Sequence, residues 1–423
     1  MPTDSPIASS TLTIFWMLVA VAAVAILSKR IRLPYTVALV IAGLIIAFVP
    51  GAPTIVLTPE LILAVFLPVL VFEAAYNLHF GHLRKNLRTV VMLAVPGVLL
   101  TAAIVAGIMR LAGFDWPIAL LFGAIVAATD PVSVVAAFKE LRAPARLRII
   151  LEGESLFNDG TSLVLFRLIL GIAVGGEFDL VSSVGQFCLV ILGGLAVGLA
   201  GGFLAAEVMR RFDDYLVETV VTVILAYGSY FLAEELHLSG VIAVVAAGLV
   251  VGNYAQKVSF SQQSLVAVNL SWEFFGFLAN SLIFLLVGLQ VNQAGPFESI
   301  EYVVIAILAV LLARALAVEA VCLVLRLWRG RRPVPWRWQI LLVWGGLRGS
   351  LSLAMALSLP YTLGGIGSPL RRRLLVMTFG VILFTLLVQG LTIKPLMARL
   401  LPPERHPPTS NPLLSVDKHP PIG

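Results

Sequence analysis

Charged residues are scarce in this sequence: Asp, Glu, Lys and Arg together make up 12% of the 423 residues. Hydrophobic residues make up 59%, and the mean hydropathy is +1.00. Soluble proteins carry roughly a quarter charged residues, so a water-soluble domain of this length would need far more polar surface. The sequence therefore predicts an all-α integral membrane protein that is embedded in the lipid bilayer.

Cysteine is almost absent, because Cys188 and Cys322 are the only two and each lies inside an apolar run. Two such thiols exclude a disulfide framework and a metal cluster, and we predict no cofactor. The first ten residues contain no Lys or Arg, so the first apolar run lacks a signal-peptide leader and is expected to remain as a helix. The net charge of +6 does not indicate nucleic-acid binding, because the basic residues lie in short clusters between apolar runs.

About thirteen apolar stretches are long enough to cross a bilayer, for which roughly 20 residues are needed. They lie near 11–28, 34–49, 59–78, 89–111, 116–138, 148–173, 181–209, 216–236, 239–255, 269–292, 299–327, 337–359 and 373–398. Residues 401–423 are rich in proline and lack apolar periodicity, which predicts a disordered cytoplasmic tail rather than a soluble domain. Function is therefore expected within the membrane.

Basic residues are distributed unevenly between the two sides of these spans. With the N-terminus outside, 22 of the 29 Lys and Arg residues fall in inner loops or the tail. The positive-inside rule thus predicts a multi-pass protein of the plasma (inner) membrane, with the C-terminus in the cytoplasm. Residues Arg371 to Arg373 are the exception, because they form a basic cluster on the predicted outer side.

Two spans contain residues that interrupt a helix. In AIVAATDPVSVV, Pro131 lacks an amide donor and clashes with the preceding turn, so we expect a break beside Thr129 and Asp130. In GGLRGS of the twelfth span, three glycines weaken the helix. The two spans run in opposite directions, which is typical of inverted repeats whose interrupted helices cross at a central site. A kinked helix in which Asp130 only caps the second half is the alternative for the fifth span.

This pattern predicts two inverted six-helix repeats. We place the first at 1–173 and the second at 216–400, with a linker helix at 181–209 between them.

Five ionisable residues fall near the centres of their spans, a costly depth that marks functional sites. They are Asp130, Glu154, Asp159, Arg314 and Arg348. Arginine keeps its proton in proteins, so pairing two arginines with three acids leaves one negative charge that needs a cation or a proton. The alternative is a purely structural network of all five.

Several residues near these charges have either a clear position or more than one possible role. Residues four apart share a helix face, so Ser155 lies over Asp159 and Asn158 lies over Glu154. Asn158 and Arg348 fit a purely structural role as well as a functional one. Glu73, near the cytoplasmic end of the third span, is expected to line an access funnel or to reach the membrane interface.

The motifs ATDPVS, LEGESLFNDGTS and GGLRGS, supported by FLPVLVFEAAYNL, SLIFLLVGL and ARALAV, resemble the monovalent cation:proton antiporter-1 family, which includes NhaP-type sodium/proton antiporters. The resemblance implies that Asp159 is the main carrier of cation and proton. Its implied companions at the Na⁺ site are Asp130, Ser155 and Thr129, with Glu73 reaching through water. Glu154 and Arg314 are implied to form a structural ion pair helped by Asn158, while Arg348 lies near a cytoplasmic funnel.

The resemblance also implies how such a protein works. Asparagine at 158 resembles the electroneutral branch, which exchanges one Na⁺ or Li⁺ per H⁺. The family fold implies a homodimer, with a moving core domain from 89–173 and 299–400 and a dimerisation domain from the remaining spans.

Three rival functions remain open from the sequence. Potassium/proton exchange would use the same site, because cavity size and flexibility set ion selectivity. A passive cation channel is a second rival. A membrane hydrolase built on Ser155 is the weakest, because no histidine lies near that motif to activate a serine. We therefore predict a transporter and not an enzyme.

Overall fold

The computed structural model describes residues 6–31, 33–49, 58–175, 179–290, 300–327, 333–360 and 369–401, and within them the chain is helical and contains no strand. The helices of the first half are α1 (Pro6–Ile31), α2 (Tyr35–Ala47), α3 (Leu67–Asn77), α4 (Phe80–Ala94), α5 (Pro96–Leu111), α6 (Trp116–Ala127), α7 (Val132–Glu140), α8 (Ala145–Ala173) and α9 (Leu180–Met209). Those of the second half are α10 (Tyr215–Glu235), α11 (Gly240–Val250), α12 (Gln256–Val258), α13 (Gln262–Leu289), α15 (Ile300–Leu327), α16 (Trp336–Trp344), α17 (Ser350–Leu357), α18 (Pro369–Phe384) and α19 (Gly390–Leu400).

Ten helical stretches in the described part of the chain are long and apolar enough to cross a membrane. Two shorter apolar helices, Tyr35–Ala47 and Leu61–Asn77, and the interrupted pair α16 and α17 bring the number of spans to thirteen. The predicted all-α membrane fold with about thirteen spans is thereby confirmed. The predicted tail lies outside the described residues, apart from Leu401.

The fourth span begins earlier than the predicted residue 89. Helix α4 starts at Phe80 and continues through Pro96 into α5, so that one helical stretch runs from Phe80 to Leu111. The basic residues in the first turns of α4 lower the mean hydropathy there, so these turns were not predicted to belong to the span. Leu83 in these turns is nevertheless fully buried and packs the helix against its neighbours. The amphipathic extension therefore has a buried apolar face even though its average composition is polar.

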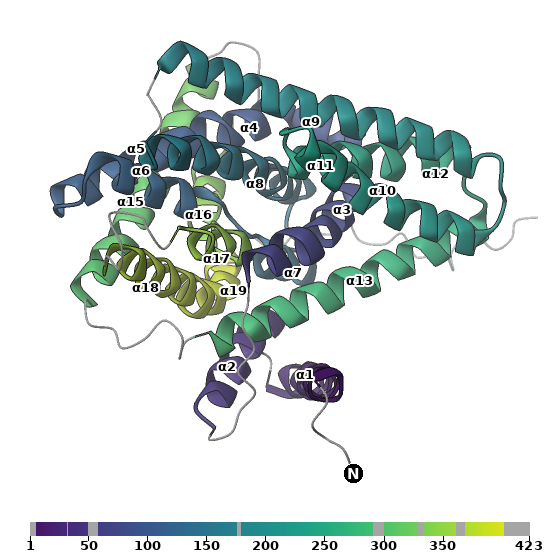
Figure 1. Cartoon of the computed structure of the whole chain (residues 1–423), viewed down its shortest axis with the longest axis horizontal. Helices are drawn as coiled ribbons and strands as arrows, with labels where there is room; N and C mark the ends of the chain where they lie inside the picture. Colours follow the sequence, from purple (N-terminus) through teal and green to yellow (C-terminus); the bar gives the residue numbers. More distant parts are fainter. Residues whose placement is uncertain are drawn as a thin grey trace, which may run out of the picture.

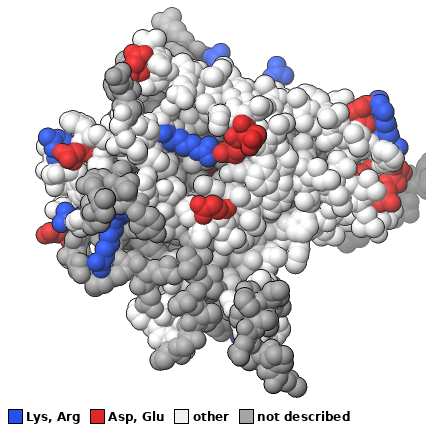
Figure 2. All heavy atoms as spheres, viewed as in Figure 1, with Lys and Arg blue, Asp and Glu red and all other residues white. Residues whose placement is uncertain are grey.

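The helices pack in two groups (Figure 1). In one group, α5 packs against α6 and α15, α4 packs against α8, and α18 packs against α15 and α17. In the other, α11 packs against α3, α9 and α10, while α13 packs against α2 and α10. Helix α9 runs along one edge of the molecule and α1 lies at its periphery. Most of the surface in this view is uncharged, and the charged side chains form a few separate groups (Figure 2).

Both predicted helix breaks are present. Helix α6 ends at Ala127 and α7 begins at Val132, while α16 ends at Trp344 and α17 begins at Ser350. The two breaks touch, because the Asp130 amide donates a hydrogen bond to the Leu347 carbonyl at 2.8 Å. Backbone groups released by each break are therefore partly satisfied by the other, as burial in a membrane requires.

The basic cluster on the predicted outer side includes a helix cap. Arg371 donates from Nε to the Leu359 carbonyl at 2.7 Å and from Nη2 to the Leu357 carbonyl at 3.0 Å. These carbonyls lie at the C-terminal end of α17, where the helix dipole favours positive charge. Capping of α17 therefore explains Arg371, whose position on the outer side the positive-inside rule did not explain.

Helices α2 and α13 approach closely at two glycines. A Cβ atom on Gly288 would lie 2.8 Å from Cα of Gly43, a separation that real side chains do not reach. We predict that Gly288→Val forces the helices apart and lowers stability by about 1–3 kcal/mol, seen as a lower midpoint of thermal unfolding in detergent. Gly228→Val is the matched control, because a Cβ atom there meets nothing within 4 Å. Equal midpoints for the two variants would contradict this packing role.

Candidate ion-binding site

The break between α6 and α7 is held by side chains of α8. Asn158 Nδ2 donates to Thr129 Oγ1 at 2.6 Å, and the Thr129 amide donates to Asn158 Oδ1 at 3.3 Å. Ser155 Oγ donates to the Thr129 carbonyl. All three residues are buried. The Asn158 side chain thus bonds the Thr129 amide that the helix break leaves free. Ser155 and Thr129 are held side by side, and their hydroxyl oxygens still have lone pairs that can accept further bonds.

Asp130 lies between the two breaks. Its Oδ1 accepts a hydrogen bond from the Val132 amide at 3.0 Å, so the carboxylate caps the N-terminus of α7. Asp130 therefore caps the second half of the fifth span, as the kinked-helix alternative expected. The helix is nevertheless fully interrupted between α6 and α7 and not only kinked. The other carboxylate oxygen lies against Gly349 of the second break, at the position that a Cβ atom would occupy.

Asp159 is a carboxylate that has no bonding partner in the described part of the chain. It is half-buried on α8, one turn beyond Ser155, and it makes no hydrogen bond or ion pair with any described residue. Its charge lies close enough to Asp130 for the two to interact electrostatically. Two neighbouring acids inside a membrane protein repel each other, so the pair attracts a cation or a proton.

Glu154 and Arg314 form a buried ion pair. Arg314 Nη2 donates to Glu154 Oε2 at 2.9 Å, and Nη1 donates to Oε1. The Leu342 carbonyl accepts a further bond from Arg314 Nη2 at 3.1 Å. The exposed fractions of the two residues are 0% for Glu154 and 6% for Arg314. Their charges cancel within the protein, whereas the two aspartates have no such counter-charge among the described residues.

Arg348 binds backbone carbonyls rather than an acid. Its Nη1 donates to the carbonyls of Ala127 and Ala128 at 3.1 and 2.9 Å, where α6 ends. A positive charge at this helix end offsets the dipole of α6. The charge tally paired both central arginines with acids, and this was wrong for Arg348: of these two arginines, only Arg314 forms an ion pair with a described acid. Asp130 and Asp159 therefore both lack a basic partner within the described structure.

The Arg348 backbone is held by a residue that the motifs did not single out. The Arg348 amide donates to Thr385 Oγ1 at 3.1 Å, and Thr385 begins a π-helical turn (Thr385–Gln389) between α18 and α19. Such turns are frequent at functional sites. Both Thr385 and Gln389 are buried polar residues in a span, so polarity at membrane depth was the signal that could have identified them.

Glu73 lies apart from this group. Its Oε1 accepts a hydrogen bond from Asn77 Nδ2 at 2.8 Å, and its side chain lies against Gly276 of α13. Within the described structure it makes no hydrogen bond to Asp130 or Asp159. Its proposed contact with the ion through water therefore stays a prediction.

Comparisons with known proteins agree with this architecture. The family model described as "Sodium/hydrogen exchanger, transmembrane" matches residues 17–399. The Na⁺/H⁺ antiporter ApNhaP of Aphanothece halophytica is 43% identical over 373 residues, which cover 87% of this chain and 70% of that protein. The Na⁺/H⁺ antiporter NhaP of Pseudomonas aeruginosa is 38% identical over 351 residues, covering 81% of each chain.

A solved structure shares the fold. The sodium proton antiporter MjNhaP1 from Methanocaldococcus jannaschii superposes with a TM-score of 0.74 at 20% identity, covering 92% of this chain and 99% of that one. The family match extends over nearly the whole membrane region, including both breaks and the carboxylates between them. The chain therefore belongs to the sodium/hydrogen exchanger family, and it is a membrane transporter rather than an enzyme.

Proposed function

We propose that this protein exchanges one Na⁺ or Li⁺ for one H⁺ across the plasma membrane, with Asp159 as the shared carrier. The observation that carries the proposal is the unpartnered Asp159 carboxylate beside Asp130, where two interrupted helices meet. A sodium ion or a proton can neutralise the Asp159 carboxylate, but the two cannot occupy its oxygens at the same time. Competition between them is what couples the two fluxes.

Oxygen atoms suited to a hard cation surround this position. We propose that Na⁺ is held by Asp159, Asp130, Ser155 and Thr129, with Glu73 contributing through water. Ser155 uses its proton in the bond to the Thr129 carbonyl, so its lone pairs remain free to face a cation. Neither Glu154 nor Arg314 is needed for this set, because each already neutralises the other.

Electroneutral exchange fits the residue beside the carrier. Asn158 is fully buried and both its amide nitrogen and its oxygen are committed to Thr129. It adds no charge and no titratable proton to the site. One cation is then exchanged for one proton, and the site crosses the membrane only when it is neutralised.

The two packing groups suggest which parts move. We propose that the spans within 89–173 and 299–400 form a moving core domain and that the remaining spans form a dimerisation domain. The repeats would be 1–173 and 216–400, joined by 181–209. In the membrane the N-terminus would lie outside and the C-terminus in the cytoplasm, following the distribution of basic residues.

Exchange in proteoliposomes tests the proposal. We expect an imposed Na⁺ or Li⁺ gradient to drive proton movement that saturates and does not respond to an imposed membrane voltage. As pH falls, the KM for Na⁺ should rise while the maximum rate is retained, because protons compete for the same carboxylate. A K⁺ gradient of equal size that drives faster exchange would favour the potassium alternative. Voltage-driven, non-saturating flux would favour a channel.

The close approach of Gly349 to Asp130 gives a further prediction. Gly349→Ala would place a methyl group where the Asp130 carboxylate now lies, so the carboxylate must move. We expect an affinity for Na⁺ about tenfold weaker, which corresponds to roughly 1.4 kcal/mol. Gly107→Ala in α5 is the control, since a Cβ atom there meets nothing within 4 Å. Equal KM values for Na⁺ in the two variants would argue against this contact.

A further inference from the structure

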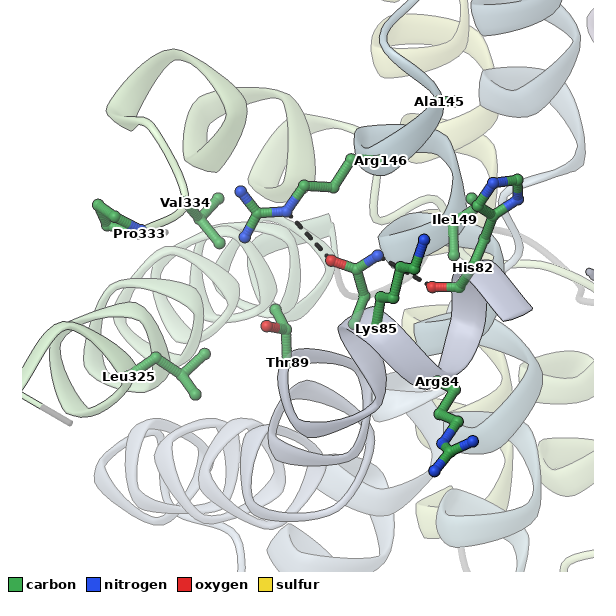
Figure 3. Close-up of a pocket in the computed structure, with 11 residues that line it drawn as sticks. His82, Arg84, Lys85, Thr89, Ala145, Arg146, Ile149, Leu325, Pro333 and Val334 are labelled. Carbon is green, nitrogen blue, oxygen red and sulfur yellow. Dashed lines mark hydrogen bonds between the residues drawn. The ribbon is translucent and has the colours of Figure 1, made fainter. Parts of the chain in front are cut away.

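A cavity with a basic lining lies away from the ion-binding site, between α4, the first turns of α8, the end of α15 and the segment before α16 (Figure 3). Its volume is about 560 Å³. Its polar lining consists of His82, Arg84, Lys85, Asn86, Thr89 and Arg146. No Asp or Glu is among the described residues that line it. A cavity of this composition fits an anionic ligand.

The positions of these basic residues oppose ordinary helix electrostatics. Lys85 lies in the second turn of α4, and Arg146 is the second residue of α8. The N-terminus of a helix carries partial positive charge, so cations there are unfavourable unless an anion offsets them. Arg146 at the N-terminus of α8 and Lys85 of α4 therefore both add positive charge to the lining of the cavity.

Arg146 is oriented rather than free to move. Its Nε donates to Asn86 Oδ1 at 3.1 Å, and its guanidinium lies 5.8 Å from the ring centre of Trp338. Asn86 in turn donates to the His82 carbonyl at 3.1 Å. Figure 3 shows Arg146 extending toward α4, whereas Arg84 points away from it. The guanidinium is thus pre-organised beside Lys85, which favours recognition of phosphate oxygens.

A second, mostly apolar hollow lies on a different face of α4. It has a volume of about 500 Å³ and is lined by Leu87, Arg88, Val91 and Met92. Residues three and four apart are neighbours on a helix surface, so Lys85 lies over Arg88 on one side and over Thr89 of the basic cavity on the other. Lys85 therefore lies where the two faces meet, with Arg88 and Met92 of the second hollow on its side of the helix.

An aromatic residue marks the level of the basic cavity in the membrane. Trp336, at the start of α16, is 62% exposed, and the Arg337 guanidinium lies 5.6 Å from its ring centre. Tryptophan and arginine in this combination are typical of the headgroup region. The basic cavity is then at headgroup depth, and the apolar hollow extends toward the acyl chains.

We propose that the cavity binds the phosphate of an anionic phospholipid, held by Lys85, Arg146 and Asn86, with an acyl chain that passes Lys85 toward Arg88 and Met92 of the second hollow. Free phosphate shares the headgroup chemistry but would leave the apolar hollow empty. The site is independent of the proposed exchange activity. It ties the first turns of α8, the helix that carries Asp159, to α4 and so stabilises the region around the carrier.

Native mass spectrometry of the purified full-length protein in detergent tests this site. Phosphatidylglycerol, phosphatidylcholine and inorganic phosphate are titrated in parallel. We expect phosphatidylglycerol to bind more tightly than phosphatidylcholine. The double variant Lys85→Gln/Arg146→Gln should weaken phosphatidylglycerol binding by roughly 30-fold, since each basic residue near a membrane surface contributes to such attraction.

Two further variants separate a binding role from a folding defect. Lys85→Arg/Arg146→Lys keeps both charges and should retain phosphatidylglycerol binding. Lys29→Gln/Arg30→Gln removes two exposed charges at the end of α1 and should bind phosphatidylglycerol as the unmodified protein does. Unchanged binding in Lys85→Gln/Arg146→Gln, or equal affinity for the two lipids, would overturn the proposal. Inorganic phosphate that displaces phosphatidylglycerol at equal concentration would overturn the assignment to a lipid.

Discussion

Replacing Asp159 by asparagine is expected to reduce sodium-driven proton movement in proteoliposomes to the rate of empty liposomes. Asparagine preserves the size and shape of the side chain but carries no charge and no exchangeable carboxyl proton. Because Asp159 has no hydrogen bond or ion pair in the described structure, the substitution should leave the fold intact. The loss would therefore come from chemistry and not from packing.

Asp115→Asn is the matched control for this experiment. Asp115 is a carboxylate of the same size before the first turn of α6, but its side chain is 87% exposed and lies 3.9 Å from Arg110. We expect exchange at the unmodified rate and an unchanged unfolding midpoint. Exchange by Asp159→Asn at the rate of this control would remove Asp159 from its role as carrier.

The second large effect is expected on stability. Arg314→Ala leaves Glu154 buried with no counter-charge, and such losses cost about 3–5 kcal/mol. The variant should unfold at a markedly lower temperature in detergent, or fail to accumulate in the membrane. Removing both charges, in Glu154→Gln/Arg314→Gln, should be less damaging because no uncompensated charge remains.

A second Arg–Glu pair in the same protein provides the comparison. Arg167 donates two bonds to Glu234, at 3.1 and 2.8 Å, but both side chains are partly exposed. Arg167→Ala should therefore cost no more than about 1 kcal/mol. If Arg167→Ala and Arg314→Ala lowered the unfolding midpoint equally, burial could not be what makes the Glu154–Arg314 pair important.

The helix breaks were predictable because their causes are local. Pro131 lacks a backbone amide donor and clashes with the preceding turn of its helix. The three glycines weaken the helix of the twelfth span whatever packs against it. The polar face of α8 followed in the same way from its four-residue spacing. Such features depend only on neighbours in the chain, so their effects can be derived before any packing is known.

Contacts between distant segments were not predictable in this way. The bond from the Asp130 amide to the Leu347 carbonyl joins residues of the fifth and twelfth spans, and Arg348 caps a helix that ended some 220 residues earlier. Counting the charged residues led us to pair Arg348 with an acid. Such a count does not include the free backbone carbonyls at a helix end, which are the groups that Arg348 binds. The early start of α4 was missed because average hydropathy does not register one buried residue, Leu83, among basic ones.

The central claim is that one negative charge at Asp159 accepts either Na⁺ or H⁺. Isothermal titration calorimetry of Na⁺ binding, repeated in buffers with different ionisation enthalpies, measures the protons released per ion bound. At a pH where the empty site is protonated, we expect the release of about one proton per Na⁺ bound, and neither binding nor release in Asp159→Asn. Na⁺ binding with no proton release, or identical release from Asp159→Asn, would contradict it.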